Sequence, residues 1–296
     1  MKSLLMYFKT IVLIFIVSSA NQSQASEPVD FTIDLIGVHL KGKFYISAGT
    51  GKFPTLVLLH GFPGGEQDVL GIGKFVSEAG INVMTFNYSG THKSEGKFSF
   101  ENTQKDIQAA FEFIHQSRNI LQYKIDTASI YLGGYSYGGG MALTYAANHP
   151  EIKSVFSIAG NDHGAFMKEY NRNPEMKEMI DKMFDELKGQ PEIVRFGPGS
   201  TPKEIAELHI IESNPTLDLR YCAPMLAPKD ILLIGGWDDQ NVSFENIILP
   251  LYRAIMSEHA AHVTITAVQD NHTFKDTRTE LVQIISEWLK SLDKGE

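Results

Sequence analysis

The stretch Gly134-Tyr135-Ser136-Tyr137-Gly138 holds the residues of this chain that are best placed for chemistry. An apolar run at 130–133 precedes the serine, and a segment that is expected to be helical from Tyr137 to about Asn148 follows it. A serine at the tip of a strand-to-helix turn adopts strained backbone angles, and side chains two residues before or after it would collide with the turn. The flanking glycines therefore predict a turn that holds the Ser136 hydroxyl clear of a sheet, with the Tyr137 N–H beside it as an oxyanion donor.

A nucleophilic serine requires a base to take its proton and a carboxylate to orient that base. The glycine and serine pattern alone arises by chance in about one chain in ten of this length, so these partners decide its meaning. Among the ten histidines, His272 lies in the loop after the last expected strand, at the same sheet edge as Ser136. His163 follows an earlier expected strand and is the rival base.

Two adjacent carboxylates, Asp238 and Asp239, follow the expected strand at 231–236. The spacing of Gly236, Asp239 and Val242 favours Asp239 as the residue that orients the base, and Asp238 remains an alternative. The three groups thus follow one another along the chain as serine, acid and histidine.

A continuous apolar run at 55–60 predicts a strand that is buried on both faces. It leads into the glycine-rich bend Gly61-Phe62-Pro63-Gly64-Gly65, which lets backbone N–H groups face the site. The N–H of Phe62 is therefore the second expected oxyanion donor. Four side chains near the expected strand ends are candidates for substrate binding: His60, Tyr135, His163 and Trp237.

Strands and helices alternate along the chain, which predicts an α/β fold with a mostly parallel central sheet and helices on both faces. An antiparallel hairpin of two or three short strands is expected within 31–46. Further strands are expected at 81–87, 130–133, 155–158 and 263–268. Helices are expected at 70–79, 103–118, 137–148, within 246–256, and at the C-terminus.

Residues 161–229 contain two well-marked helices and no strong strand. Asn173 and Pro174 fit the start of the first helix, and Thr201-Pro202-Lys203-Glu204 is a capping box for the second. The first helix places apolar residues on one face: Met176, Met179, Ile180, Met183, Phe184 and Leu187. We expect a small helical cap, inserted before the acid-bearing strand, whose apolar face packs over the strand ends and shapes the substrate pocket.

Residues 1–25 have the layout of a secretory signal peptide, with two lysines, a short apolar run and small residues up to Ala25. Because the run is too short to span a bilayer, we expect cleavage after Ala25, no stable membrane anchor, and a periplasmic or secreted domain at 26–296. Loss of two lysines changes the formal charge from −9 to −11, which argues against nucleic acid as a partner. The single cysteine, Cys222, excludes an internal disulfide, and the oligomeric state stays open.

The serine turn, the Gly236-x-x-Asp239-x-x-Val242 loop and His272 together resemble the α/β-hydrolase-fold serine hydrolases, over essentially the whole chain after residue 25. Three shorter motifs resemble the acylaminoacyl-peptidase-like and serine-aminopeptidase-like branch: His60-Gly61-Phe62-Pro63-Gly64, Asn87-Tyr88-Ser89-Gly90 and Ser94-Glu95-Gly96. The resemblance implies serine attack on a carbonyl, an acyl-enzyme and release by water, without metal or cofactor. Because some relatives carry the acid after an earlier strand, Asp162 is a further alternative to Asp239.

Hydrolysis of an ester with a small or medium acyl group is the expected function, because the cap is modest in size and mixed in polarity. A peptidase is the main alternative, in which the cap acids Glu169, Glu175 or Glu178 would bind a substrate amine. An acyltransferase would use the same three groups with another acceptor. A non-catalytic binding protein on the same fold is the last alternative.

Overall fold

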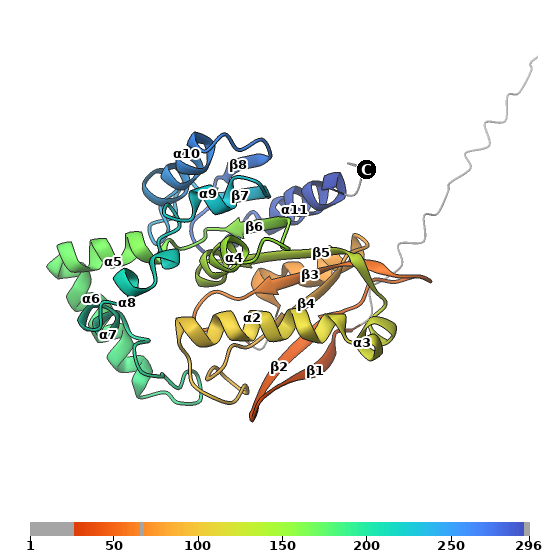
Figure 1. The fold of residues 1–296 in the computed structure, drawn as a ribbon, viewed down its shortest axis with the longest axis horizontal. Helices are drawn as coiled ribbons and strands as arrows, with labels where there is room; N and C mark the ends of the chain where they lie inside the picture. Colours follow the sequence, from red (N-terminus) through yellow and green to blue (C-terminus); the bar gives the residue numbers. More distant parts are fainter. Residues whose placement is uncertain (1–26, 66–67, 293–296) are drawn as a thin grey trace, which may run out of the picture.

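A computed structural model describes residues 27–65 and 68–292, so the expected signal peptide at 1–25 lies outside the described residues. In this part of the chain eight strands form one sheet, in the order β1-β2-β4-β3-β5-β6-β7-β8 (Figure 1). Only the pairs β1–β2 and β2–β4 are antiparallel, which confirms the predicted, mostly parallel α/β sheet. The strands are β1 Val29–Leu35, β2 Val38–Tyr45, β3 Phe53–Leu59, β4 Asn82–Phe86, β5 Ile125–Tyr135, β6 Ser154–Ile158, β7 Asp230–Gly236 and β8 Val263–Val268.

Helices cover both faces of this sheet. They are α1 Ile72–Glu78, α2 Phe100–His115, α3 Ser117–Gln122, α4 Tyr137–Asn148, α9 Ala223–Leu226, α10 Leu249–Ser257 and α11 Arg278–Leu292, with short helical turns η1 Val69–Gly71, η2 Pro215–Leu217 and η3 Phe244–Ile248. Helix α1 packs against α11 in one layer. In the other layer α2 contacts α4, α4 contacts α9, and α9 contacts α10. Among the described residues, no helix combines the length and the apolar character needed to cross a membrane.

The core lies where apolar runs meet small residues. Strands β3 and β4 are almost entirely buried, as expected for strands with helices on both sides. Helix α4 is buried along nearly its whole length, because its glycines and alanines allow it to pack closely against β5 and β6. The observed bounds of α4 and β8 are the predicted ones.

The N-terminal hairpin, the strand expected at 130–133 and the helix expected at 103–118 differ from the prediction, and the strand, β5, extends over Ile125–Tyr135. The N-terminal hairpin has two longer strands instead of two or three short ones, because Gly42 lies inside β2, where a side chain would overlap the Phe31 ring. The helix expected at 103–118 begins at Phe100, since the Ser99 hydroxyl accepts the Asn102 N–H at 3.1 Å. It ends at His115, where extended backbone at Gln116 separates it from α3.

Between β6 and β7 the chain forms α5 His163–Arg172, α6 Pro174–Lys188, α7 Pro202–Glu207 and α8 Ile210–Ser213, which gather beyond one end of the sheet in Figure 1. The sequence predicts two helices here, which correspond to α6 and to the segment that begins with α7. It predicts neither α5 nor the break that separates α8 from α7. The Asp162 carboxylate caps α5 by accepting the Ala165 N–H at 2.9 Å. Asn173 caps α6, and Thr201 and Glu204 form the expected capping box at α7.

The apolar face of α6 buries a narrower stripe than predicted. Met179 and Met183 are 62% and 41% exposed, whereas Ile180 is buried and Phe184 is half-buried. Helix α6 packs against α5 and α7, and the ring of Phe184 reaches the loop that follows β3. A helical stripe in the sequence gives the direction of the apolar face but not the width of the partner that covers it.

The loop at 87–99, after β4, is anchored to the core from two sides. The Tyr88 hydroxyl donates to the His60 carbonyl at 2.6 Å. The buried Asp106 of α2 accepts the N–H and the hydroxyl of Ser89 at 2.7 and 2.6 Å. Burial raises the pKa of Asp106 to about 7, against the hydrogen bonds from Ser89, which lower it.

Candidate active site

The turn between β5 and α4 places Ser136 at a strained backbone position. Its φ and ψ are 53° and −119°, in a region that residues with a Cβ rarely adopt. A Cβ on Gly134 would overlap the Gly138 carbonyl oxygen, and a Cβ on Gly138 would overlap the His60 carbonyl oxygen. The two glycines are therefore required by close backbone contacts on both sides of the serine.

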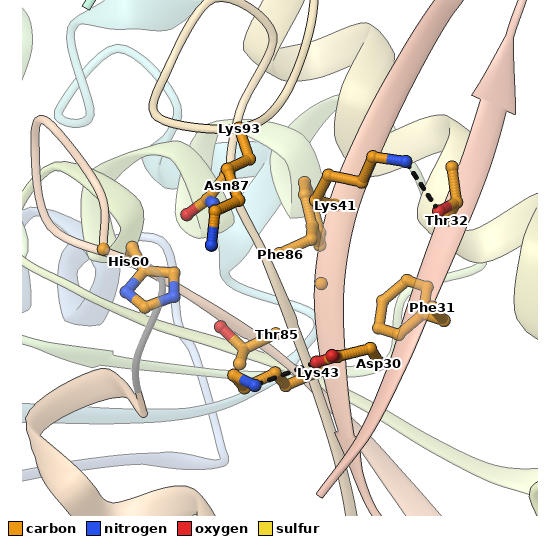
Figure 2. A pocket seen from close by; sticks show the side chains of 12 residues that line it. Asp30, Phe31, Thr32, Lys41, Lys43, His60, Thr85, Phe86, Asn87 and Lys93 are labelled. Carbon is orange, nitrogen blue, oxygen red and sulfur yellow. Dashed lines mark hydrogen bonds and ion pairs between the residues drawn. The ribbon is translucent and has the colours of Figure 1, made fainter. Parts of the chain in front are cut away.

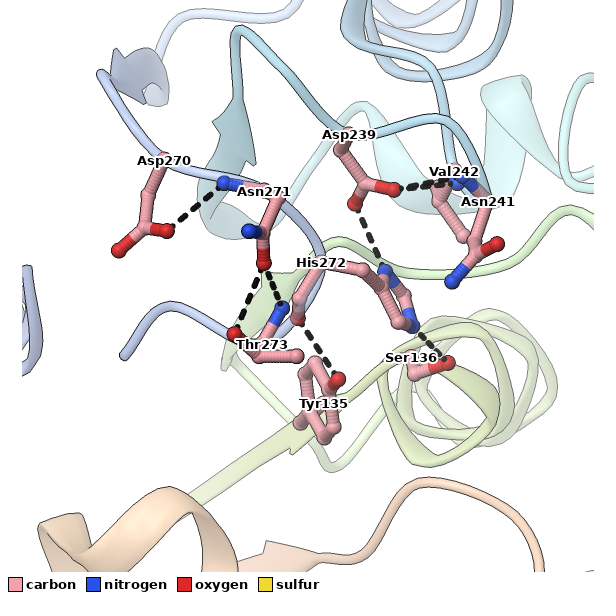
Figure 3. A network of polar contacts seen from close by, with 9 residues as sticks. All are labelled: Tyr135, Ser136, Asp239, Asn241, Val242, Asp270, Asn271, His272 and Thr273. Atoms are coloured by element: carbon pink, nitrogen blue, oxygen red, sulfur yellow. Dashed lines mark hydrogen bonds and ion pairs between the residues drawn. The ribbon is translucent and has the colours of Figure 1, made fainter. Parts of the chain in front are cut away.

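His272 and Asp239 meet Ser136 at the carboxyl edge of the sheet (Figure 3). His272 Nε2 lies 3.0 Å from Ser136 Oγ, and His272 Nδ1 lies 2.7 Å from Asp239 Oδ2. The loops after β8 and β7 carry these two residues, so segments far apart in the sequence supply the three groups. With its Nδ1 proton donated to the carboxylate, the imidazole presents Nε2 as an acceptor for the serine proton.

The Asp239 carboxylate is fully buried, yet all its contacts suit an ionised group. Its second oxygen, Oδ1, accepts the N–H groups of Asn241 and Val242 at 2.8 Å each. His272 keeps 17% of its side chain exposed, so the imidazole lies at the boundary between the protein interior and the solvent. This arrangement can hold one tautomer of the imidazole and stabilise its cation.

Tyr135, expected to contact substrate, is in contact with the histidine loop. Its hydroxyl donates to the His272 carbonyl at 2.7 Å, and the two ring centroids are 5.1 Å apart. Burial, helped by the negative charge of Asp239, raises the pKa of Tyr135 to about 12. Asp270, which sequence reasoning missed, fixes the same loop by accepting the N–H groups of Asp276 and Thr277 at 2.9 and 3.0 Å.

The two expected oxyanion donors belong to segments that adjoin Ser136. A Cβ on Gly61 would come within 3.3 Å of the Ser136 Cβ, so the Gly61–Phe62 peptide is adjacent to the serine. The Phe62 N–H makes no hydrogen bond to any residue in the described part of the chain. The Tyr137 N–H is in the first turn of α4, where donors lack helical acceptors. Both N–H groups can therefore serve an anionic oxygen.

The alternative acids have other partners. Asp162 is buried at the start of α5, where it accepts the Leu219 N–H at 3.3 Å in addition to its capping bond and lies 3.5 Å from Arg220 Nε. The exposed Asp238 accepts a hydrogen bond from Gln269 Nε2 at 2.6 Å. The structure thus brings Asp239, and neither alternative, to His272.

His163, the rival base, is buried away from the serine hydroxyl. It is the first residue of α5, and its ring packs on Phe100 and Tyr137 with centroids 4.6 and 5.2 Å apart. Its Nδ1 lies 3.1 Å from the amide nitrogen of Asn161, and its Nε2 is buried with no hydrogen-bond partner in the part of the chain that the structure describes. Burial lowers the pKa of His163 to about 3, which keeps the imidazole neutral.

His60 and Trp237, the other expected substrate contacts, lie apart from each other. The His60 side chain lines a cavity of about 340 Å³ together with Thr85 and Asn87 of the neighbouring strand end (Figure 2), and none of the three residues of the Ser136 cluster lines it. Burial lowers the pKa of His60 to about 4. Trp237 directly follows β7, is 52% exposed, and packs on Phe244 with ring centroids 4.8 Å apart.

An aromatic cluster next to the oxyanion loop was not foreseen from the sequence. It consists of Phe62, Phe98, Tyr137, Phe184 and Phe196, and each of these rings contacts at least two of the others. Its members come from three loops and two helices, so no local pattern links them. The cluster gives the site an apolar side, opposite in character to the polar side that carries His272 and Asp239. Within residues 27–65 and 68–292, no cluster of three His, Cys, Asp or Glu side chains could hold a metal ion.

Comparison with known proteins gives a consistent assignment. Residues 54–193 match the family model described as the alpha/beta hydrolase fold. The chain is 27% identical over 281 residues to a proline iminopeptidase of Saccharolobus solfataricus, covering 80% of this chain and 87% of that protein. It is 24% identical over 257 residues to lipase 1 of Psychrobacter immobilis, covering 76% of each.

Solved structures show the same fold. The acylaminoacyl peptidase of Pyrococcus horikoshii superimposes with a TM-score of 0.65 at 17% identity, covering 91% of this chain and 42% of that chain. The serine turn, the order of strands and these relatives agree with the resemblance derived from the motifs. The chain has the α/β-hydrolase fold of a serine hydrolase, and the proteins to which it is similar include a peptidase, a lipase and an esterase.

Proposed function

We propose that the protein hydrolyses esters of small or medium acyl groups through a Ser136, His272 and Asp239 triad. Ser136 Oγ attacks the ester carbonyl while His272 takes its proton, and Asp239 stabilises the imidazolium. The N–H groups of Phe62 and Tyr137 bind the oxyanion. His272 then protonates the leaving alcohol, and water releases the acyl group by the same steps. The continuous hydrogen-bond chain from Ser136 to Asp239 is the observation that carries this proposal.

An amide substrate is the second candidate, because a proline iminopeptidase is among the relatives. The cap acids give it little support. Glu175 and Glu178 are exposed on α6, and Glu169 forms an ion pair with Arg172. No carboxylate of these three is held toward Ser136 by a contact in the described residues, so a bound amine would have no evident counter-charge there.

A panel of paired substrates tests the choice. We expect the purified mature protein to hydrolyse short-chain aryl esters, and to hydrolyse aminoacyl anilides at least about 100-fold more slowly in kcat/KM, about 2.7 kcal/mol. Anilide turnover equal to that of the matching esters would favour the peptidase. Addition of an alcohol acceptor to the same assay would reveal an acyltransferase by formation of a new ester.

A fluorophosphonate probe distinguishes an esterase, a peptidase or an acyltransferase from a non-catalytic protein. We expect the probe to label the protein at a single serine, because a triad-activated hydroxyl reacts with such reagents. Absence of both labelling and ester turnover would leave only the non-catalytic binding protein.

We further propose that residues 1–25 direct export and are removed after Ala25, on the evidence of their sequence pattern alone. Expression with the full N-terminus in a bacterial host should then yield a periplasmic or secreted protein that begins at Ser26. N-terminal sequencing checks this. A cell-associated protein that still begins at Met1 would contradict the proposal.

A further inference from the structure

The ring of Phe62 lies at the centre of the aromatic cluster. It contacts four rings from separate segments, with centroid distances of 4.9 Å to Phe98, 5.5 Å to Phe184, 6.1 Å to Tyr137 and 6.2 Å to Phe196. The pair with Phe184 is the stacked one, with 13° between the ring planes. The residue that offers the oxyanion N–H is therefore also in contact with a helix of the cap.

The backbone around Phe62 has few side chains to hold it. Gly61 precedes it, and Gly64 and Gly65 follow Pro63, so the ring of Phe62 is the main apolar anchor of this loop. One backbone hydrogen bond, from Gly64 N–H to the Gly61 carbonyl at 2.6 Å, closes the turn. Glycine-rich backbone is easily displaced, so the direction of the Phe62 N–H depends on what packs against its ring.

The chain that follows α6 is attached to the body of the protein. Residues 193–197 run beside the loop at 87–99, and four backbone hydrogen bonds join the two segments: His92 to Ile193, Arg195 to Gly90, Phe98 to Arg195 and Gly197 to Phe98, at 2.7 to 2.9 Å. The Arg195 guanidinium also donates to the His92 carbonyl at 3.2 Å. These bonds hold the segment after α6 against the loop at 87–99, and Phe196 of this segment contacts the ring of Phe184 with centroids 5.6 Å apart.

Phe184 also belongs to the small core of the cap. That core contains Met167, Tyr170, Ile180 and Ile205, and Phe184 packs against it from its edge. Phe184 therefore contacts the cap on one side and the oxyanion loop on the other. A residue with both contacts can transmit the position of the cap to the Phe62 N–H.

We propose that Phe184 is a positioning residue for catalysis: its stacking on Phe62 holds the Phe62 N–H toward the oxyanion, so that the cap and the oxyanion site act as one unit. This inference rests on the proposed esterase function. Displacement of a donor by a fraction of an ångström weakens its bond to the oxyanion more than its contact with the neutral ester. The effect of losing Phe184 should therefore appear in kcat rather than in KM.

The test compares three variants on an acetyl ester, whose short acyl group limits direct contact with the cap. Phe184→Ala is expected to lower kcat by about 3- to 10-fold with KM changed less than about twofold, the scale of one aromatic pair. Phe184→Tyr keeps the ring and should restore most of kcat. Met183→Ala removes an exposed apolar side chain from the same helix and should match the wild type within about twofold.

A thionoester of the same acid and alcohol gives a readout specific to the oxyanion. Its sulfur accepts hydrogen bonds poorly, so a correctly placed donor favours the oxygen ester. Phe184→Ala should therefore reduce the oxygen-to-sulfur rate ratio, whereas damage that is merely structural would lower both rates equally. Thermal unfolding of each variant establishes that the comparison is made between folded proteins.

An unchanged rate ratio, a change confined to KM, or an equal loss in Met183→Ala would each overturn the inference while leaving the esterase proposal intact. If the wild type cleaves neither ester but reacts with a fluorophosphonate, the labelling rates of the same variants replace kcat, because the phosphonyl oxygen occupies the oxyanion site. A wild type inert to esters and probe alike refutes the proposed function, and this inference with it.

Discussion

Replacement of Ser136 by alanine should lower kcat for short-chain ester hydrolysis by about 10⁴- to 10⁶-fold. The variant has no Oγ to form an acyl-enzyme, and His272 Nε2 loses the hydroxyl that lies 3.0 Å away. Folding should be preserved, because alanine has the same Cβ at the strained φ of 53° and, among the described residues, Oγ bonds only to His272. Steady-state kinetics and fluorophosphonate labelling measure the effect.

The alanine variant, purified in the same way, also measures the background from host esterases. Circular dichroism and thermal unfolding should give curves close to those of the wild type. A folded variant that keeps more than about a hundredth of the wild-type kcat above that background would mean that another residue is the nucleophile.

Replacement of Asp239 by asparagine should lower kcat by about 10³- to 10⁴-fold, although the shape of the side chain is unchanged. The N–H groups of Asn241 and Val242 require an acceptor, so the amide oxygen will turn toward them and the amide NH₂ toward His272. His272 Nδ1 must then accept, which moves the ring proton to Nε2. Nε2 would face Ser136 as a donor and could not take its proton.

The two alternative acids provide matched controls for this variant. Asp238→Asn changes an exposed side chain that meets Gln269 and should keep kcat within about twofold. Asp162→Asn keeps a good capping residue at α5 and should keep kcat within about threefold. If either control lost more activity than Asp239→Asn, the assignment of Asp239 would be wrong.

The sequence by itself was sufficient for features that depend on nearby residues. The close approach of Gly134 to the Gly138 carbonyl lies within the serine turn itself, and small residues ahead of Pro150 set the bounds of α4. Side chains within one turn cap α6 and α7. The alternation of buried strands with helices was likewise enough to predict the α/β sheet, because the apolar residues of each strand indicate that it is buried. The order of the loops that carry the serine, the acid and the histidine could then be predicted from the strands that precede them.

Only the tertiary structure decided which side chains meet. Asp162, Asp238 and Asp239 all follow strands of the sheet, and the distances to His272 and to other partners distinguish them. Tyr135 became a support of the histidine loop through a bond that spans 137 residues. The stack of Phe62 on Phe184 joins a loop to a cap helix more than a hundred residues away.

The physical reason for this division is the range of the interactions. Turns, caps and the periodicity of burial arise from contacts within a few residues, so residue types and spacing predict them. Hydrogen bonds and ring contacts between distant segments depend on how the helices and loops are placed around the sheet. A local pattern gives a residue its secondary structure, as it does for Ser136, but only the packed fold gives Phe62, Tyr135 and Phe184 their neighbours.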